Sequence, residues 1–132
     1  MDIAVEFKGG RTVEAAVHGF TITTDQPPAA GGSGSAPAPF DLFLASLATC
    51  AGFYVFDFCI HRNISTDGVR LVMHTKTDAE KHLVGHIGIE IILPAGFPEK
   101  YEKAVVRAAE LCSVKRHLHE PPAIDTYTTR ST

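Results

Sequence analysis

The feature that most restricts how this chain can fold is an apolar segment, Phe40–His61, whose hydrophobic residues lie on every side of a helix. The segment has no proline and a single glycine, and Pro39 before it suits the first position of a helix. At 1.5 Å per residue, such a helix is about 33 Å long. A helix that is apolar all round must be buried all round. Because 132 residues offer little material to enclose it, we expect a partner subunit to cover one face, and hence a homodimer.

Alternating apolar and polar residues predict β-strands on both sides of this helix. In Leu83–Leu93, for example, Ile87, Ile89 and Ile91 share one face. A second, amphipathic helix is expected at Pro98–Cys112, which Val114–His119 could continue as a short turn. The other strands are expected at Ile3–Phe7, Thr12–Val17, Phe20–Thr24, Val69–Thr75 and Ala123–Thr129.

This order of elements predicts an α+β fold with an antiparallel or mixed sheet, formed by residues 1–132 as one domain. Between the first strands and the long helix, residues 25–39 are mostly Pro, Gly, Ser and Ala, so no regular element is expected there. The stretch Gly31–Gly34 lacks the Lys-Ser/Thr that completes a P-loop. A flexible loop is therefore expected rather than a phosphate site.

Composition and charge indicate an ordinary globular protein. Hydrophobic residues make up 45% and charged residues 20% of the chain, and the formal charge of −3 gives no basic face for nucleic acid or anionic lipid. The N-terminus lacks the basic and continuous apolar regions of a secretory signal. The longest apolar run, 42–56, is short and interrupted for a membrane span. We therefore expect a cytoplasmic protein with neither nucleic acid nor membrane as a partner.

Three cysteines in a reducing compartment are not a disulfide framework, so each thiol is judged by its position. Cys50 lies in the middle of the long helix, and Cys112 lies on the apolar stripe of the second. Both could be buried hydrophobes, as free cysteines often are. The buried reading is favoured from position alone, but the two could also meet across a helix contact if their α-carbons approach within about 7 Å. Cys59 points to the other side of its helix from Cys50, and we interpret it as structural.

The remaining polar residues give weaker signals. The chain has seven histidines, but no Cys-x-x-Cys accompanies them and spacing sets no third ligand, so no metal site is expected. His117, close to Cys112 in sequence, could lower the pKa of a thiol. Asp41 falls in the first turn of the long helix, where a capping role is expected before a catalytic one.

Two blocks of sequence resemble the OsmC/Ohr family. Gly32–Gly34 followed by Pro39–Cys50 resembles the family signature, in which a glycine-rich loop leads through P-x-x-L into a long helix bearing the reactive cysteine. Leu111–Leu118 is similar to the family's second block, usually a Cys followed by Pro or Ser, a small turn and Leu. The order of strands and helices also agrees, so the resemblance spans nearly the whole chain.

The resemblance implies an OsmC-like fold, with sheets wrapped around the long helix, and an intertwined homodimer whose two sites each take residues from both subunits. It implies a peroxidase active in oxidative-stress defence, with Cys50 as the peroxidatic and Cys112 as the resolving cysteine. The Cys50 thiolate would attack the peroxide, its sulfenic acid would condense with Cys112, and an external dithiol would reopen the disulfide, without a cofactor. An apolar pocket between subunits would favour organic hydroperoxides over hydrogen peroxide.

Two further residues are candidates through the same resemblance. In the Ohr branch an early arginine supports the thiolate, and Gly9-Gly10-Arg11 resembles that segment, so Arg11 is the candidate. Its alternative is an exposed arginine of a hairpin turn. The Glu that holds this arginine is replaced here by Phe40, and Asp41 lies one place further, about 100° around the helix. In this respect the segment resembles a less characterised OsmC-like branch with the motif P-x-acid-L, and Asp41 is a candidate substitute for the Glu.

Two other functions remain open. The same scaffold could hold an apolar ligand in the dimer cleft, with cysteines that are merely buried, and the loss of the Glu at position 40 favours this reading. It could also be a redox sensor, oxidised at Cys50 without turnover. Retention of both Cys50 and Cys112 favours the peroxidase. Turnover with a dithiol reductant would distinguish a peroxidase from a sensor.

Overall fold

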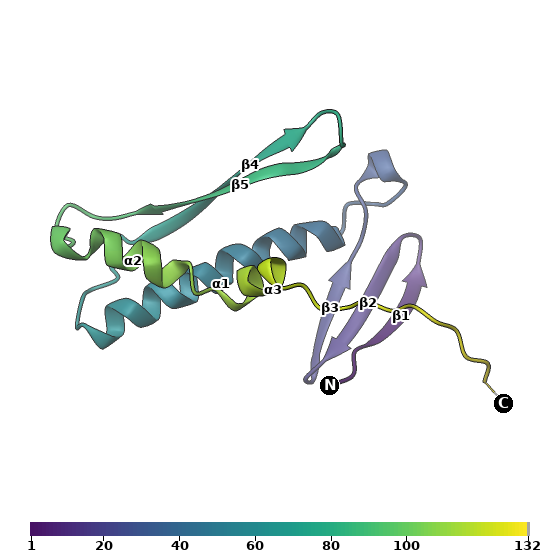
Figure 1. The fold of residues 1–132 in the computed structure, drawn as a ribbon. Helices are drawn as coiled ribbons and strands as arrows, with labels where there is room; N and C mark the ends of the chain where they lie inside the picture. Colours follow the sequence, from purple (N-terminus) through teal and green to yellow (C-terminus); the bar gives the residue numbers. More distant parts are fainter. Residues whose placement is uncertain (132) are drawn as a thin grey trace. The chain divides into compact units, whose positions relative to one another are not determined.

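The computed structural model describes residues 1–131, which fall into two compact units, Met1–Ser46 and the chain from Leu47 onward. The long helix α1, Pro39–His61, begins in the first unit and continues into the second (Figure 1). Its start at Pro39 and its end at His61 agree with the helix predicted from sequence.

The first unit contains a three-stranded antiparallel sheet of β1 (Ala4–Gly9), β2 (Thr12–Val17) and β3 (Phe20–Thr24), as predicted. The two hairpin turns use residues with positive φ, Gly9 and Gly10 in the first and His18 and Gly19 in the second. Paired residues share a face, and the pairing gathers apolar side chains on one face of the sheet, namely Val5, Phe7, Val13, Ala15, Val17, Phe20 and Ile22. This face is largely open to solvent in the single chain, with Phe7 88% exposed.

The loop that follows β3 is more ordered than its composition suggests. A short 3-10 helix, η1, forms at Pro28–Ala30, so the expectation that residues 25–39 carry no regular element is wrong. Asp25 is 1% exposed, and one of its oxygens accepts from the N–H and hydroxyl of Ser33 (3.2 and 2.8 Å) and of Ser35 (3.1 and 2.8 Å). A side chain at Gly32 would collide with the carbonyl oxygen of Gln26. A buried carboxylate therefore holds this loop in one conformation.

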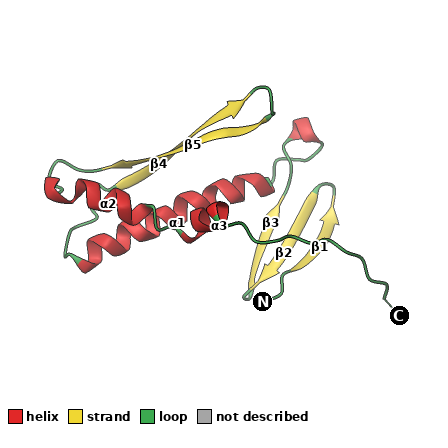
Figure 2. Ribbon diagram, viewed as in Figure 1, coloured by secondary structure: helices red, strands yellow, loops and turns green. Residues whose placement is uncertain are grey.

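The second unit packs an antiparallel hairpin of β4 (Arg70–Asp78) and β5 (Leu83–Ile92) against helices (Figure 2). After β5 come the 3-10 turn η2 (Glu99–Tyr101) and the helices α2 (Glu102–Ala109) and α3 (Ser113–His119). The core joins α1 and α2 with the inner face of the hairpin, and its buried members are Ala51, Val55, Phe58, Cys59, Phe97, Val105 and Ala109. Leu71, Ile89 and Ile91 from the hairpin pack against it. This α+β architecture with antiparallel sheets is the predicted fold class.

The helix after β5 is shorter than predicted. The sequence pattern continued the second helix through Cys112, but α2 ends at Ala109 and the chain begins a separate helix at Ser113. Cys112 lies between them in an extended conformation, with φ −46° and ψ 123°, as the N-cap residue of α3. The last predicted strand, Ala123–Thr129, does not form in the described chain, because residues 121–131 are exposed and have no strand partner there.

Only one face of α1 is covered in the single chain. Leu47, Ala51, Val55, Phe58 and Cys59 are buried, whereas Phe53, Phe56 and Ile60 on another face are half exposed or more. By length and composition α1 is apolar enough to cross a membrane, a test that the core helix of a soluble protein also passes. Within the second unit, α1 therefore keeps an apolar face exposed.

Candidate functional site

Cys50 and Cys112 meet in the second unit. Cys50 is half-buried on α1 and lies close enough to Cys112 for each thiol to affect the pKa of the other. Cys112 is fully buried, and its sulfur also lies 3.9 Å from the carbonyl oxygen of Leu47, one turn before Cys50 on α1. Both thiols are free. The structure thus brings together the two cysteines, 62 positions apart in the sequence, that the family resemblance paired.

The two thiols hold their protons unequally. Burial raises the pKa of the Cys50 thiol, but hydrogen bonds from the Val114 N–H, the Cys112 thiol, and the N–H and hydroxyl of Ser113 outweigh it, so the pKa lies below its usual value. Burial raises the pKa of Cys112, and the neighbouring Cys50 raises it further, against the lowering effect of the Lys115 N–H. Cys50 is therefore the more acidic thiol of the pair, and Cys112 is the less acidic one.

The segment that carries Cys112 is held by short local contacts. The backbone N–H of Lys115 donates to the Cys112 sulfur at 3.5 Å, which makes this sulfur the cap of α3. The ammonium of Lys115 pairs with Glu110 at 2.6 Å, tying α3 to the end of α2. These contacts join Cys112 to the first turn of α3, and α3 to the end of α2.

Cys59 and His117 are not part of this pair. Cys59 is fully buried in the core, and burial raises its pKa, partly offset by the charge of Arg62. This placement confirms the structural role expected for it. His117 uses Nδ1 to contact the carbonyl oxygen of Ser113 at 2.6 Å, so its ring is engaged with the α3 backbone. Among the described residues no group of three His, Cys, Asp or Glu side chains could hold a metal ion.

Arg11 and Asp41 lie in the first unit. The exposed Arg11 side chain passes over Gly31 of the loop, where its Nε would lie 3.3 Å from a Cβ built on that glycine. One oxygen of Asp41 accepts the backbone N–H of Ala38 at 3.0 Å, three residues before it. This is the reciprocal half of a capping box at the start of α1. The capping role expected of Asp41 is therefore present.

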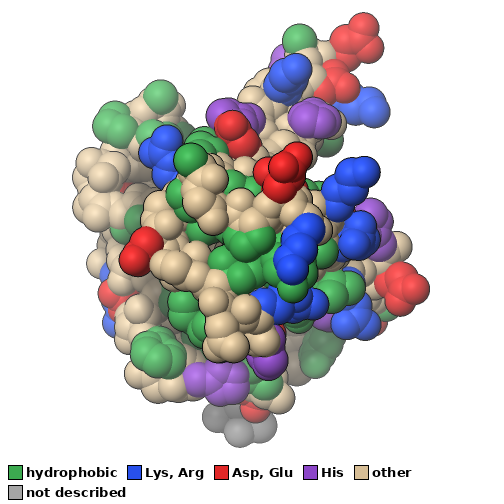
Figure 3. Space-filling model, turned by 90° about the vertical axis from the view of Figure 1, so that its left-hand side faces the viewer, with side chains coloured by type: hydrophobic (Ala, Val, Ile, Leu, Met, Phe, Trp, Pro, Cys, Tyr) green, Lys and Arg blue, Asp and Glu red, His purple; other side chains and the backbone are tan. Residues whose placement is uncertain are grey.

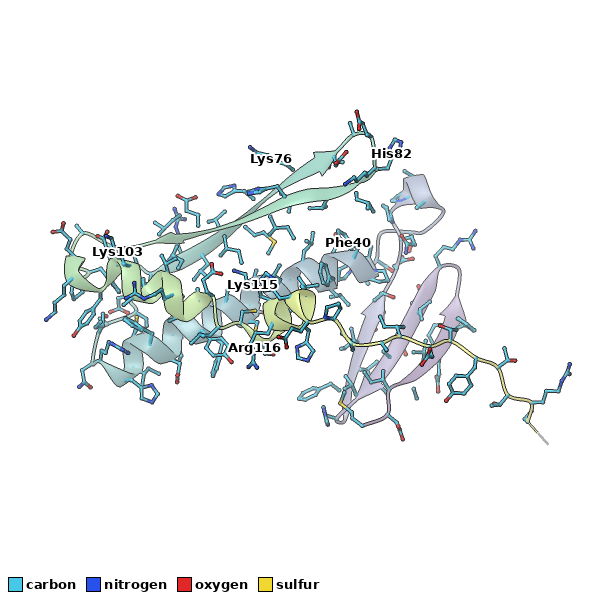
Figure 4. The ribbon with its side chains drawn as sticks, viewed as in Figure 1. Phe40, Lys76, His82, Lys103, Lys115 and Arg116 are labelled. Atoms are coloured by element: carbon cyan, nitrogen blue, oxygen red, sulfur yellow. The ribbon has the colours of Figure 1, made fainter. Side chains whose placement is uncertain are left out.

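The second unit contains two hollows. A cavity of about 290 Å³ is lined by Leu47, Ile87, Ile89, Glu110, Lys115, Leu118 and His119. Figure 4 shows its Lys115 projecting from α3. A wider groove of about 590 Å³ runs between α1 and α2, lined by Tyr54, Asp57, Phe58, His61, Arg62, Ala104, Arg107, Ala108 and Leu111. Figure 3 views the molecule from the side where α1 ends and α2 begins. Hydrophobic side chains gather in the middle of this face, with Lys and Arg side chains beside them.

Sequence reasoning missed the backbone and side-chain donors that surround Cys50. Ser113 stands next to Cys112 in a recognisable block, so its proximity to Cys50 follows once the two cysteines are paired. Asp25 was also missed. Its only sequence signal is a single carboxylate before a serine- and glycine-rich stretch, Ser33–Ser35, whose hydroxyls could reach it.

The structure thus defines an α+β protein with a pair of neighbouring free cysteines, whose pKa values are shifted in opposite directions. A family model of OsmC-like proteins matches residues 32–127, a range that includes both cysteines. The chain therefore belongs to the OsmC-like protein family, which confirms the resemblance seen in its sequence. No protein with a curated description matches the chain in sequence.

Solved structures show the same fold. A candidate osmotic stress induced and detoxification response protein of Psychrobacter arcticus is 24% identical, with 86% of this chain and 85% of that one covered and a TM-score of 0.74. An OsmC-like protein of Mycoplasma pneumoniae is 14% identical, with coverage of 91% and 87% and a TM-score of 0.70. The organic hydroperoxide resistance protein OhrB of Bacillus subtilis is 19% identical, with coverage of 92% and 93% and a TM-score of 0.53.

Proposed function

We propose that this protein is a thiol-dependent peroxidase that reduces organic hydroperoxides in oxidative-stress defence. The observation that carries the proposal is the contact between Cys50 and Cys112, in which hydrogen bonds lower the pKa of one thiol and burial raises that of the other. A peroxidase needs one sulfur as a thiolate nucleophile and a second that remains a thiol until the first is oxidised. Family neighbours named for organic hydroperoxide resistance support the peroxide as substrate class.

The reaction balances with these two sulfurs and an external dithiol. The Cys50 thiolate attacks the O–O bond of ROOH, forming an S–O bond and releasing RO⁻, which takes a proton from water to become ROH. The Cys50 sulfenic acid then condenses with the Cys112 thiol to give a disulfide and water. A dithiol reductant attacks the disulfide and leaves both cysteines reduced. No cofactor takes part in any step.

A homodimer is part of this proposal. The uncovered α1 face (Phe53, Phe56, Ile60) and the open apolar face of the β1–β3 sheet both expose large hydrophobic side chains. Exposed apolar patches of this kind mark interaction sites. A second copy of the chain would bury both and would enclose the cysteine pair in an apolar pocket. We place the dimer in the cytoplasm, where a reducing environment keeps the thiols free.

Arg11 is proposed as the cation that supports the Cys50 thiolate, and Asp41 as its substitute for the Glu of the Ohr branch. The test is the rate of peroxide reduction in Arg11→Ala and Asp41→Ala. A slower reaction in both supports the pair. A normal rate in Asp41→Ala with a lower unfolding midpoint assigns Asp41 to the capping contact with Ala38 alone.

The direct test of the proposed function is intact-mass analysis after one equivalent of cumene hydroperoxide, with peptide mapping. A loss of two hydrogens mapped to Cys50 and Cys112 is the expected result, followed by recovery of both thiols with a dithiol. If both thiols survive unchanged, the groove between α1 and α2 favours the other candidate, a binding protein for an apolar ligand.

A further inference from the structure

We infer that the groove between α1 and α2 is a second binding site of this protein, whose ligand is an apolar molecule with a single carboxylate, such as a medium-chain fatty acid. The carboxylate binds Arg107 and Arg62, and the apolar chain lies along the floor of the groove. The inference goes beyond the proposed peroxidase, because the lining of the groove includes neither Cys50 nor Cys112.

The groove forms because α2 presents small side chains where α1 presents large ones. Ala104 and Ala108 lie one turn apart on α2, and Tyr54 and Phe58 lie one turn apart on α1. Packed helix axes are about 8–10 Å apart, and an alanine side chain does not fill that distance. A hollow of about 590 Å³ remains between the helices. This volume lies within the range of about 300–1,000 Å³ that small-molecule sites occupy, and its apolar floor fits a hydrocarbon chain.

Two arginines in the lining of the groove have no anionic partner. Among residues 1–131, no carboxylate lies within ion-pair distance of Arg62 or Arg107. The guanidinium of Arg62 lies 3.8 Å from the centre of the Phe58 ring, and it donates to the Phe58 carbonyl oxygen at 3.4 Å. Phe58 therefore holds one cation at the edge of the apolar floor. A guanidinium matches the geometry of a carboxylate and can donate two parallel hydrogen bonds to it.

The charges in the lining favour a ligand with one negative charge. The groove has one carboxylate, that of Asp57, and its Oδ1 lies 3.4 Å from Nδ1 of His61 rather than beside an arginine. The same Nδ1 also contacts the Asp57 carbonyl oxygen at 2.8 Å. Two arginines against one carboxylate leave one positive charge while His61 is neutral. A monocarboxylate neutralises that charge, whereas an alcohol of the same length leaves it unpaired.

The groove lies on a different side of α1 from the face assigned to the second copy. That face carries Phe53, Phe56 and Ile60. Successive residues of a helix are about 100° apart, so Tyr54 and Phe58 point roughly 150° away from the middle of that face. A dimer formed through Phe53, Phe56 and Ile60 therefore does not use the floor of the groove.

The experiment measures the binding of decanoate to the full chain by isothermal titration calorimetry, with 1-decanol as the uncharged probe. We expect one decanoate per chain, bound about tenfold more tightly than the alcohol, since a hydrogen bond to a charged group contributes about that factor. Arg107→Gln should weaken the binding of decanoate by about the same factor and leave that of decanol unchanged. Arg116→Gln removes an exposed arginine of α3 outside the groove (Figure 4), and this matched control should bind decanoate as the parent does.

A second variant tests the place of binding without changing any charge. Ala108→Leu fills the space between the two helices with a residue that helices favour. Decanoate should bind to this variant at least about tenfold more weakly, because burial of its chain is lost, while the circular dichroism of the protein stays that of the parent. Binding that persists unchanged in Ala108→Leu would place the ligand elsewhere and overturn the inference.

The remaining outcomes also decide the inference. A parent protein that does not bind decanoate overturns it, whether a second copy fills the groove or nothing does. Equal affinity for decanoate and decanol, or equal affinity of the parent and Arg107→Gln for decanoate, overturns the recognition of a carboxylate. These results are independent of peroxide reduction. A parent that forms no disulfide with peroxide overturns the peroxidase, and decanoate binding that depends on Arg107 still supports the second site.

Discussion

The sulfur of Cys112 accepts the backbone N–H of Lys115 at 3.5 Å, so the atom that would join Cys50 in a disulfide is also the cap of α3. α3 has no fully buried residue, and this cap and the Lys115–Glu110 ion pair are two of the contacts that hold it. The redox state of the cysteine pair and the stability of α3 are therefore linked through one atom.

This link predicts that oxidation loosens α3. A disulfide sulfur is a weak acceptor and must turn toward Cys50, so the cap is lost, at a cost of about 1 kcal/mol. We expect the amides of residues 113–119 to exchange hydrogen about fivefold faster in the disulfide form than in the reduced form. Exchange in β4–β5 serves as the internal control. Equal exchange of α3 in both redox forms would contradict the prediction.

Cys50→Ser should abolish peroxide reduction, because serine has no nucleophilic sulfur to oxidise. The matched control is Cys59→Ala, which removes the other cysteine of α1. Cys59 lies in the hydrophobic core rather than in the cysteine pair. Initial rates of hydroperoxide loss with a dithiol reductant measure both variants. Full activity in Cys50→Ser, or its loss in Cys59→Ala with the fold intact, would reject the assignment of Cys50.

Cys112→Ser should leave Cys50 reactive for a single turnover. With no buried thiol to trap it, the sulfenic acid persists and is oxidised further to sulfinic acid. Mass analysis should show one and then two oxygen atoms added at Cys50, where the parent protein shows a disulfide. A Cys50 that resists over-oxidation as the parent does would mean that Cys112 is not its resolving partner.

Asp25→Asn should loosen the loop between β3 and α1, because an amide oxygen lacks the negative charge that strengthens the four hydrogen bonds from Ser33 and Ser35. Those hydrogen bonds hold the pKa of Asp25 well below its usual range. Its contribution to stability is therefore complete above the unfolded pKa near 3.9 and is lost as the pH falls toward the lower folded value.

The check is the urea midpoint of parent and variant from pH 6 down to pH 2. The parent should be the more stable above about pH 4, and its advantage should shrink as the solution becomes more acidic. The matched control is Asp67→Asn, a carboxylate exposed on the turn before β4. A pH-independent difference between parent and Asp25→Asn would show that the charge of Asp25 does not hold the loop.

Phe53→Asp should convert the proposed dimer to a monomer, since a carboxylate on the uncovered face of α1 would be buried unpaired against the second copy. Light scattering after size exclusion measures the mass of the parent and the variant at micromolar concentration. Lys103→Asp, on the exposed side of α2 (Figure 4), is the control that should remain dimeric. A monomeric parent protein would overturn the dimer itself.

The sequence by itself determined the class of fold and most of its elements. Strands β1–β5 and the limits of α1 follow from apolar periodicity, from turn glycines and from Pro39, all of which act over a few residues. The two cysteine blocks identified the family. The uncovered face of α1 was also foreseeable, because a helix apolar on all sides needs more partners than a short chain supplies.

Only the tertiary structure decided those features that depend on contacts between residues far apart in the sequence. The pattern that carried the second helix to Cys112 could not show that its sulfur would cap a separate α3, since the choice depends on packing against Leu47 of α1. The unequal proton affinities of Cys50 and Cys112 arise from burial and from donors of residues 113–115. Asp25 organises its loop through serines eight and ten residues away. Hydrogen bonds of this kind depend on positions in space, which local sequence patterns do not encode.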